Sequence, residues 1–562
     1  MALTPDPSHT FVHTRSTRPF FGQAASANLA AALFVVVLPL VAHWQFSRLG
    51  FNPTDDGFVL AVSRRMLAGE LPHRDFIAIH PIGSSILHLP FVWLGGDRVF
   101  LASRLFVWFE LAATALVWTQ AIERLIGKPR AWPTELAIAV VAFVLSSHYF
   151  PVMAWPTIDG LLLAGLGVRL CLARPRTAHS IGYFLIGAAF ICKQSYLPLY
   201  PVTVVLLHQG RGLRWVAGLI PALAYATVVA VGGGLGDAVL QLSAQTGIIS
   251  VGVLKFLWEY AVPWGVLAGY LALRVIYAPD RTARGRLDCA AAGLLIFSTL
   301  SAACWALAQG RFLGAPAFGL FGLAVGACIA CAFETDAVRG RWVAGVLVVT
   351  AAWCAALSIG YNTPALASGL CAAYVLSLVD ASPATAAFTR GVWRTLPYLV
   401  LAAGAAICFR DARDHYVYLD RSASELTYKL DDVLPGGAGL LTNENTYAFL
   451  ADLRQAIDKA GGGKYAVLPD LAGYWVEAAQ LNPLPSDWPN WIELARPELA
   501  SRFLRAMDSD RPNLTFIVQK IDAFSLSRGF VPMLDSERYA VASYVRRNYT
   551  LVGETRFFGL YR

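Results

Sequence analysis

Two adjacent carboxylates, Asp55 and Asp56, follow the first long hydrophobic stretch of the chain, within the segment 52–58 (NPTDDGF). A carboxylate at a membrane surface is suited to take a proton from a hydroxyl group that acts as a nucleophile. Consecutive residues of a helix point ~100° apart, so we expect one carboxylate to do chemistry and the other to cap a helix or bind a partner. The alternative is structural, because the free amides and dipole of a helix N-terminus stabilise acids.

Basic side chains that suit an anionic group, most simply a phosphate, occur in and after the same region. Arg74 and His80 lie in the polar loop, and Arg104 lies in the apolar start of the next hydrophobic stretch. Lys193 lies within the apolar stretch 180–207. A cation in apolar surroundings is costly unless it has a partner, and arginine can hold two phosphate oxygens. The alternatives are solvated charges in the loop and, for Lys193, a side chain that snorkels to the surface.

Two further positions complete the set of candidate substrate-binding residues. Asp159 follows the segment 155–157 (WPT), and with His148 and Tyr149 it forms a second polar cluster. An ordinary helix cap is the alternative for Asp159. Arg311 lies in the short loop 309–312 (QGRF) between two hydrophobic stretches.

The composition predicts which elements position these residues. Of the 562 residues, 56% are hydrophobic and 15% are charged, whereas soluble domains are about one-quarter charged. The apolar residues come in runs of roughly 17–25, the length of a helix that crosses a bilayer. The net charge of +8 does not indicate nucleic-acid binding, because most basic residues outside the last domain lie in short loops, as is typical of the cytoplasmic side of membrane proteins. We therefore predict a mainly α, polytopic membrane protein, with the lipid bilayer and no nucleic acid as partner.

The distribution of charge predicts the topology. The tail 1–23 carries Arg15 and Arg18, so we expect a cytoplasmic N-terminus and a retained first span rather than a cleaved signal. The transmembrane region would run over 24–409 with about thirteen helices, with its first outer loop at 46–97. Within that loop, 77–95 is expected to lie on the membrane. Lys193 would lie at the outer end of a hairpin of two short spans. The helices are expected at about 24–44, 98–122, 134–150, 158–173, 180–207 (the hairpin), 215–233, 260–278, 289–307, 313–333, 342–360, 364–380 and 395–409.

The last part of the chain, residues 410–562, is polar and has a different pattern. Segments 447–460 and 498–507 have helical spacing, and 465–468 and 514–518 are typical of buried strands. A final helix over 537–547 and a strand pair within 551–561 are expected. An odd number of spans places this small α/β domain outside, in the periplasm or the extracellular space.

Other motifs are absent from the sequence. There is no Walker loop, GxSxG, HExxH or dinucleotide fingerprint, and the predicted cytoplasmic loops are too short for a nucleotide-consuming domain. An activated donor must therefore come from elsewhere. The nine cysteines all fall in apolar stretches, so no disulfide framework is expected.

With these features, the sequence resembles the C-type (GT-C) membrane glycosyltransferases. The closest kinds are the bacterial protein O-mannosyltransferases and lipid A aminoarabinose transferases, of families 39 and 83. The resemblance covers about the first 210 residues by motif and the remainder by architecture alone. The matching elements are Asp55-Asp56, segment 65–76 (RMLAGELPHRDF), His80-Pro81, segment 102–105 (ASRL), Asp159 and Lys193-Gln194.

The resemblance implies a mechanism and a location. The donor would be a sugar on a polyprenyl phosphate such as undecaprenyl phosphate, and the acceptor would be a cell-envelope glycan such as lipopolysaccharide, a lipid or a protein. Asp55 would be the general base of an inverting displacement at the outer face of the bacterial inner membrane. Arg104, Lys193, Arg74 or Arg311 would stabilise the leaving phosphate. Some members of this class use a divalent metal, and the sequence leaves open whether this chain does.

Two other functions remain as alternatives. A lipid-linked saccharide transporter or flippase would carry ionisable residues and broken helices near the membrane midplane. Here the predicted spans are nearly free of charge and polar residues gather at the outer face, which favours chemistry at the surface. An O-antigen ligase-like protein would be expected to place its key residues in a large loop between later spans. A silent scaffold is the remaining possibility, with the terminal domain as a binding module.

Overall fold

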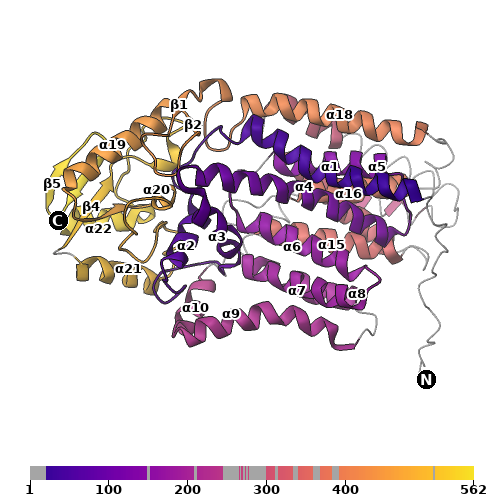
Figure 1. Cartoon of the computed structure of the whole chain (residues 1–562), viewed down its shortest axis with the longest axis horizontal. Helices are drawn as coiled ribbons and strands as arrows, with labels where there is room; N and C mark the ends of the chain where they lie inside the picture. The colour runs from indigo at the N-terminus through magenta and orange to yellow at the C-terminus, as the bar shows by residue number, and fades with distance from the viewer. Residues whose placement is uncertain are drawn as a thin grey trace.

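The computed structural model describes residues 21–148, 152–207, 212–244, 299–310, 314–332, 339–357, 367–381, 392–510 and 513–562, with isolated helical positions between 265 and 276. The described chain is mainly helical and has two small β-sheets. Long helices run side by side along the length of the molecule, and the strands gather at one end of it (Figure 1). We call these two parts the helical bundle and the C-terminal domain.

The described helices of the bundle follow the predicted hydrophobic stretches. They are α1 (Phe21–Phe46), α4 (Val99–Ile126), α5 (Trp132–Ser147), α6 (Pro156–Cys171), α7 (Arg176–Cys192), α8 (Leu199–Leu207), α9 (Ile220–Val231), α14 (Gly314–Ala332), α15 (Arg339–Ala356), α16 (Ser368–Ala381) and α18 (Val392–His415), with 3-10 helices η2 (Gln194–Tyr196) and η3 (Gly212–Leu219). Local signals mark their ends, since α5 and α6 have a proline in their first turn and α4 ends at Gly127 with φ 75°.

Four described helical segments are long and apolar enough to cross a membrane: Ala25–Phe46, Gly83–Ile126, Gly212–Val231 and Trp393–His415. The predicted number of about thirteen spans is not confirmed. Most of the predicted span 260–278 and the first part of 289–307 lie outside the described residues. The cysteines in the described part of the chain form no disulfide bond with one another.

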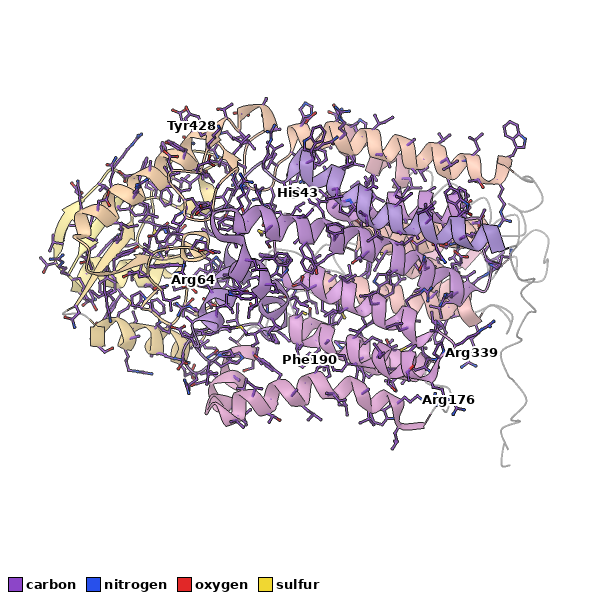
Figure 2. The ribbon with its side chains drawn as sticks, in the orientation of Figure 1. His43, Arg64, Arg176, Phe190, Arg339 and Tyr428 are labelled. Carbon is purple, nitrogen blue, oxygen red and sulfur yellow. The ribbon has the colours of Figure 1, made fainter. Side chains whose placement is uncertain are left out.

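The break at Lys193 has the form expected from the sequence. Helix α7 ends at Cys192, and α8 begins after the short helix η2. Arg176, at the start of α7, and Arg339, at the start of α15, both lie at the end of the bundle opposite the C-terminal domain (Figure 2). Phe190, near the other end of α7, lies closer to that domain (Figure 2).

Short elements connect the bundle to the C-terminal domain. They are α2 (Phe58–Leu67), α3 (Gly83–Gly95), η1 (Gly96–Arg98) and α10 (Leu235–Leu242). Helices α2 and α3 pack against each other and lie between the bundle and the domain (Figure 1). Whether α3 lies on a membrane, as predicted for 77–95, remains a prediction.

The C-terminal domain contains the expected helices and strands around a mixed sheet in the order β3-β4-β6-β5. Strand β3 pairs parallel with β4, while β4 and β5 each pair antiparallel with β6. Helix α21 makes the crossover that a parallel pair requires. The elements are η5 (Ala423–Glu425), β1 (Tyr428–Lys429), β2 (Leu441–Thr442), α19 (Glu444–Ala460), β3 (Lys464–Leu468), α20 (Ala472–Trp475), α21 (Pro497–Asp510), β4 (Leu514–Gln519), η7 (Ala523–Ser525), η8 (Glu537–Tyr539), α22 (Ala540–Asn548), β5 (Leu551–Glu554) and β6 (Phe558–Tyr561).

The first polar loop and the C-terminal domain share one hydrophobic core. Phe51 and Leu60 of the loop and Phe100 at the start of α4 are buried together with Phe449 and Trp475 of the domain. A second buried cluster fills the bundle, and a third lies inside the domain. The domain is therefore not attached through the last helix alone, because it also packs against the loop that carries Asp55 and Asp56.

Candidate functional site

The loop before α2 is organised by Asn52. The Asn52 Oδ1 atom accepts hydrogen bonds from the backbone N–H of Thr54 (3.1 Å) and of Asp55 (3.0 Å) and from Thr54 Oγ1 (2.5 Å). In return, the Asn52 N–H donates to Asp56 Oδ2 at 2.7 Å. Helix α2 begins at Phe58 with Gly57 as its N-cap and without a side-chain cap, so neither acid caps the helix, as the sequence had allowed for one of them. The two acids therefore lie in a closed turn, not in a helix.

Close backbone packing holds this turn against the C-terminal domain. A Cβ atom at Gly57 would lie 2.3 Å from the N atom of Gly473, so a larger residue does not fit. The Gly473 N–H donates to the carbonyl oxygen of Pro53 at 2.9 Å. Helix α20 of the domain thus fixes the position of Asp55 and Asp56.

Asp56 forms a buried ion pair with Arg104 of α4. Its Oδ1 atom accepts from Arg104 Nη2 at 2.7 Å, and both side chains are almost fully buried. Arg104 also donates to the carbonyl oxygens of Ser47 and Gly50, at 2.6 and 2.8 Å. The partner expected for Arg104 is therefore Asp56. These contacts take up both terminal nitrogens of Arg104, so its role here is to hold the turn.

Asp55 lies beside this pair and contacts the start of the C-terminal domain. Tyr418 donates its hydroxyl to Asp55 Oδ2 at 3.1 Å. Burial and, to a smaller extent, the charge of Asp56 raise the pKa of Asp55 to about 7, although the hydrogen bond from Tyr418 opposes that rise. A carboxylate with a pKa near 7 is suited to general base catalysis at neutral pH, because it accepts a proton more readily than an ordinary aspartate.

A small cavity adjoins Asp56. Asp56, Arg104, Arg413 and Tyr418 are among the residues that line it. Arg413 of α18 packs its guanidinium against the ring of Trp108, 5.8 Å from its centroid. Its Nη1 atom is buried and has no hydrogen-bond partner in the part of the chain that the structure describes. Neither Arg413 nor Tyr418 was predicted from the sequence, although both come shortly after the last predicted span in the chain.

His80 and Lys193 lie near each other, and His80 contacts the ring of Phe58. The Phe58 ring contacts the rings of His80, Trp155 and Trp488, with centroids 6.1, 6.0 and 4.9 Å away. His80 Nδ1 donates to Gln194 Oε1 at 2.8 Å. Burial, together with the nearby charge of Lys193, lowers the pKa of His80 to about 4. His80 is therefore neutral at pH 7 and can offer a hydrogen bond but no charge to a phosphate.

Lys193 is a buried cation with little of its hydrogen-bonding capacity used. Its exposed fraction is 4%, and Nζ donates to Thr157 Oγ1 at 2.9 Å. This is its single hydrogen bond among the described residues, and an ammonium group has three donors. Phe58, three residues after Asp55, thus contacts aromatic rings and a neutral imidazole, and that imidazole interacts with the Lys193 ammonium.

The remaining predicted residues are not part of this group. Arg74 is exposed and forms a two-point contact with Asp75, with both N–O distances 2.8 Å. Asp159 lies in the bundle, where its Oδ1 atom is 3.3 Å from His88 Nε2. Arg311 lies outside the described residues. His88 and Glu110, which the sequence reading did not select, lie next to Asp159. An ionisable residue within an apolar stretch is the signal that could have found Glu110.

The sequence leaves open whether the chain binds a divalent metal. Among the described residues, Asp55 and Asp56 do not form a ligand set for such an ion. Asp56 already binds Arg104 and the Asn52 amide, and Asp55 binds Tyr418. In the described segments, the three-residue group with metal-ligand spacing is His88, Glu110 and Asp159.

Comparison with known proteins gives no family assignment. No protein-family model matches the chain, and no curated protein matches it. Among solved structures it is similar to ArnT from Cupriavidus metallidurans in the apo state, with 12% sequence identity and a TM-score of 0.44. The match covers 96% of this chain and 98% of that one. A likeness at this level does not define a function.

Proposed function

We propose that this protein is a membrane glycosyltransferase of the GT-C type. It transfers a sugar from a polyprenyl-phosphate donor to a hydroxyl group of a cell-envelope glycan, lipid or protein at the outer face of the inner membrane. The observation that carries this proposal is the environment of Asp55. This carboxylate is buried beside the Asp56–Arg104 ion pair, contacts Tyr418 and has its pKa raised to about 7.

The surface of the bundle supports a position in a bilayer. Helix segment Ala25–Phe46 has 22 residues, which is about 33 Å of helix and enough to cross a hydrocarbon core of ~30 Å. Large apolar side chains such as Leu29 and Leu33 are exposed along α1. Such a surface is favourable in lipid and unfavourable in water.

Exposed tryptophans occur at both ends of the bundle. Trp44 lies in the last turn of α1 and Trp93 near the end of α3, while Trp132 and Trp393 lie in the first turns of α5 and α18. Tryptophan is enriched at both interfaces between lipid and water. The bundle axis would therefore cross the membrane, with the turn that holds Asp55 at one surface.

In the proposed reaction, Asp55 removes the proton of the acceptor hydroxyl as its oxygen attacks the anomeric carbon of the sugar. The bond between that carbon and the phosphate oxygen breaks on the opposite face, so the configuration inverts. The leaving group is polyprenyl phosphate. Lys193 stabilises the charge of this phosphate, because it is a buried cation with free donors and lies near His80, which contacts Phe58. Phe58, Trp155 and Trp488 offer apolar surface for the sugar ring or the lipid.

The experiment uses the full-length protein in proteoliposomes with polyprenyl-phosphate sugars and extracted envelope acceptors. Release of polyprenyl phosphate and labelling of the acceptor are followed together. We expect transfer by the natural protein and a loss of about 100-fold or more in Asp55→Asn, the size of effect that general bases contribute. Lipid translocation without transfer would indicate a flippase, and equal transfer by Asp55→Asn would exclude Asp55 as the base.

A further inference from the structure

Three buried side chains from three helices meet inside the bundle, apart from the group around Asp55. His88 lies on α3, Glu110 on α4 and Asp159 on α6. One potential ligand atom from each lies within 4.8 Å of the other two. His88 Nε2 is 3.3 Å from Asp159 Oδ1 and 4.0 Å from Glu110 Oε2. Each side chain has an exposed fraction of 1% or less.

The polar atoms of this group are not satisfied by the protein. Both carboxylate oxygens of Glu110 and the Oδ2 atom of Asp159 are buried without a hydrogen-bond partner in the described chain. The salt bridges that these two acids form among the described residues are both with His88. Two buried carboxylates facing each other without a compensating cation are strongly unfavourable. A cation bound between the two carboxylates would remove this cost, and a proton shared between them is the alternative that the test must distinguish.

We infer that His88, Glu110 and Asp159 bind a divalent transition-metal ion of the Zn²⁺ type. One imidazole and two carboxylates are ligands that such ions take from proteins. Because ligand atoms lie ~2.0–2.2 Å from the ion, two of them can be at most ~4.4 Å apart. The measured separations of 3.3 and 4.0 Å from His88 Nε2 satisfy this limit.

The surroundings of His88 orient its imidazole for metal binding. Ser103 Oγ lies 3.2 Å from His88 Nδ1. When Nε2 binds the metal, Nδ1 carries the proton and donates a hydrogen bond to Ser103 Oγ. Such a hydrogen bond fixes the orientation of a metal-bound histidine.

The ion would hold together the start of α6 and its neighbours. Asp159 lies two residues after Thr157, which accepts the hydrogen bond of Lys193. A metal that ties α6 to α3 and α4 would therefore fix the position of Lys193. The metal site does not depend on the proposed glycosyl transfer, because no step of that transfer is assigned to His88, Glu110 or Asp159.

The test measures metal in the purified full-length protein in detergent. The protein is stripped with a chelator, incubated with Zn²⁺, freed of excess ion and analysed for metal content. We expect about one zinc ion per chain in the natural protein and at least a tenfold loss of bound zinc in Glu110→Gln and Asp159→Asn. Glu123→Gln is the matched control, since it removes another carboxylate from α4 that pairs with Arg130. Its zinc content should be unchanged.

A second measurement requires no variant of the ligands. Co²⁺ bound to the natural protein should give the visible absorption of a site with nitrogen and oxygen ligands, and Zn²⁺ should displace it. Ser103→Ala should weaken zinc binding by about 10- to 100-fold, as loss of a group that orients a ligand does. Retention of zinc by Glu110→Gln would overturn the inference. So would a natural protein that binds neither ion, since the two acids would then share a proton instead.

Discussion

Asp56 and Arg104 lie 48 positions apart in the sequence and form a buried ion pair with an O–N distance of 2.7 Å. The pair ties the turn after α1 to the first turns of α4. Asp55 lies in the same turn and accepts a hydrogen bond from Tyr418. The Asp56–Arg104 pair therefore positions the proposed base, and neither member of the pair is proposed to contact substrate.

Removal of one member of the pair should destabilise the protein. Asp56→Asn leaves the Arg104 guanidinium buried without its counter-charge, which costs about 3–5 kcal/mol. We expect a lower thermal unfolding midpoint in detergent, measured by tryptophan fluorescence. The double variant Asp56→Asn with Arg104→Gln should recover part of the loss, because the buried charge is gone. This account would be contradicted if the double variant lost more stability than the two single variants lose in sum.

The rate of transfer should depend on pH through Asp55. Its pKa is raised from 3.8 to about 7, so the active carboxylate form is lost as the pH falls below about 7. Tyr418 stabilises that charged form by its hydrogen bond. In Tyr418→Phe the pKa should therefore rise, and the midpoint of the pH–rate profile should move to higher pH. A midpoint unchanged by Tyr418→Phe would separate the titration from Asp55.

The same shift has an opposite consequence for stability. The folded protein holds the Asp55 proton more tightly than the unfolded chain, so the contribution of Asp55 to stability falls as the pH rises from about 4 to about 7. Asp55→Asn should remove this contribution. Unfolding midpoints at pH 5 and pH 8 should then differ less in the variant than in the natural protein.

Lys193 and Arg74 provide a matched pair of basic residues for the donor site. Lys193 is buried with free donors, whereas Arg74 is exposed and already paired with Asp75. Lys193→Met should weaken binding of the polyprenyl-phosphate donor by about 10- to 100-fold, the value of a hydrogen bond to a charged group. Arg74→Met should change it less than twofold. Donor and acceptor KM values measure this, and an equal loss for both substrates in Lys193→Met would argue against a phosphate contact.

Attachment of the C-terminal domain depends on Arg65 of α2. Its Nε and Nη2 atoms donate to the two carboxylate oxygens of Asp487 at 2.6 and 2.9 Å, and the pair is buried. Arg65→Met should cost about 3–5 kcal/mol and speed proteolysis within 410–562. The exposed Arg98 serves as control, since Arg98→Met should leave the cleavage rate unchanged. Limited proteolysis with time-resolved gel analysis measures both.

The secondary structure of the C-terminal domain was predictable because its patterns are local. The buried strand Leu514–Gln519 and the helix Glu444–Ala460 follow from periodicity over a few residues, with Asn443 and Gly461 as its end signals. The break at Lys193 was also visible, since a charge interrupts a long apolar stretch. The thirteen predicted spans are not confirmed, because apolar runs alone do not separate spanning helices from shorter ones.

What the sequence determined by itself is the presence of acids and cations near the ends of apolar helices, because hydropathy and charge are properties of single residues and their neighbours. Which residues meet was decided by the tertiary structure alone. Asp55 meets Tyr418, which lies 363 positions away, and Glu110 meets His88 and Asp159 from separate helices. These contacts depend on how loops and helices pack, and no local pattern encodes a distance between segments so far apart in the chain.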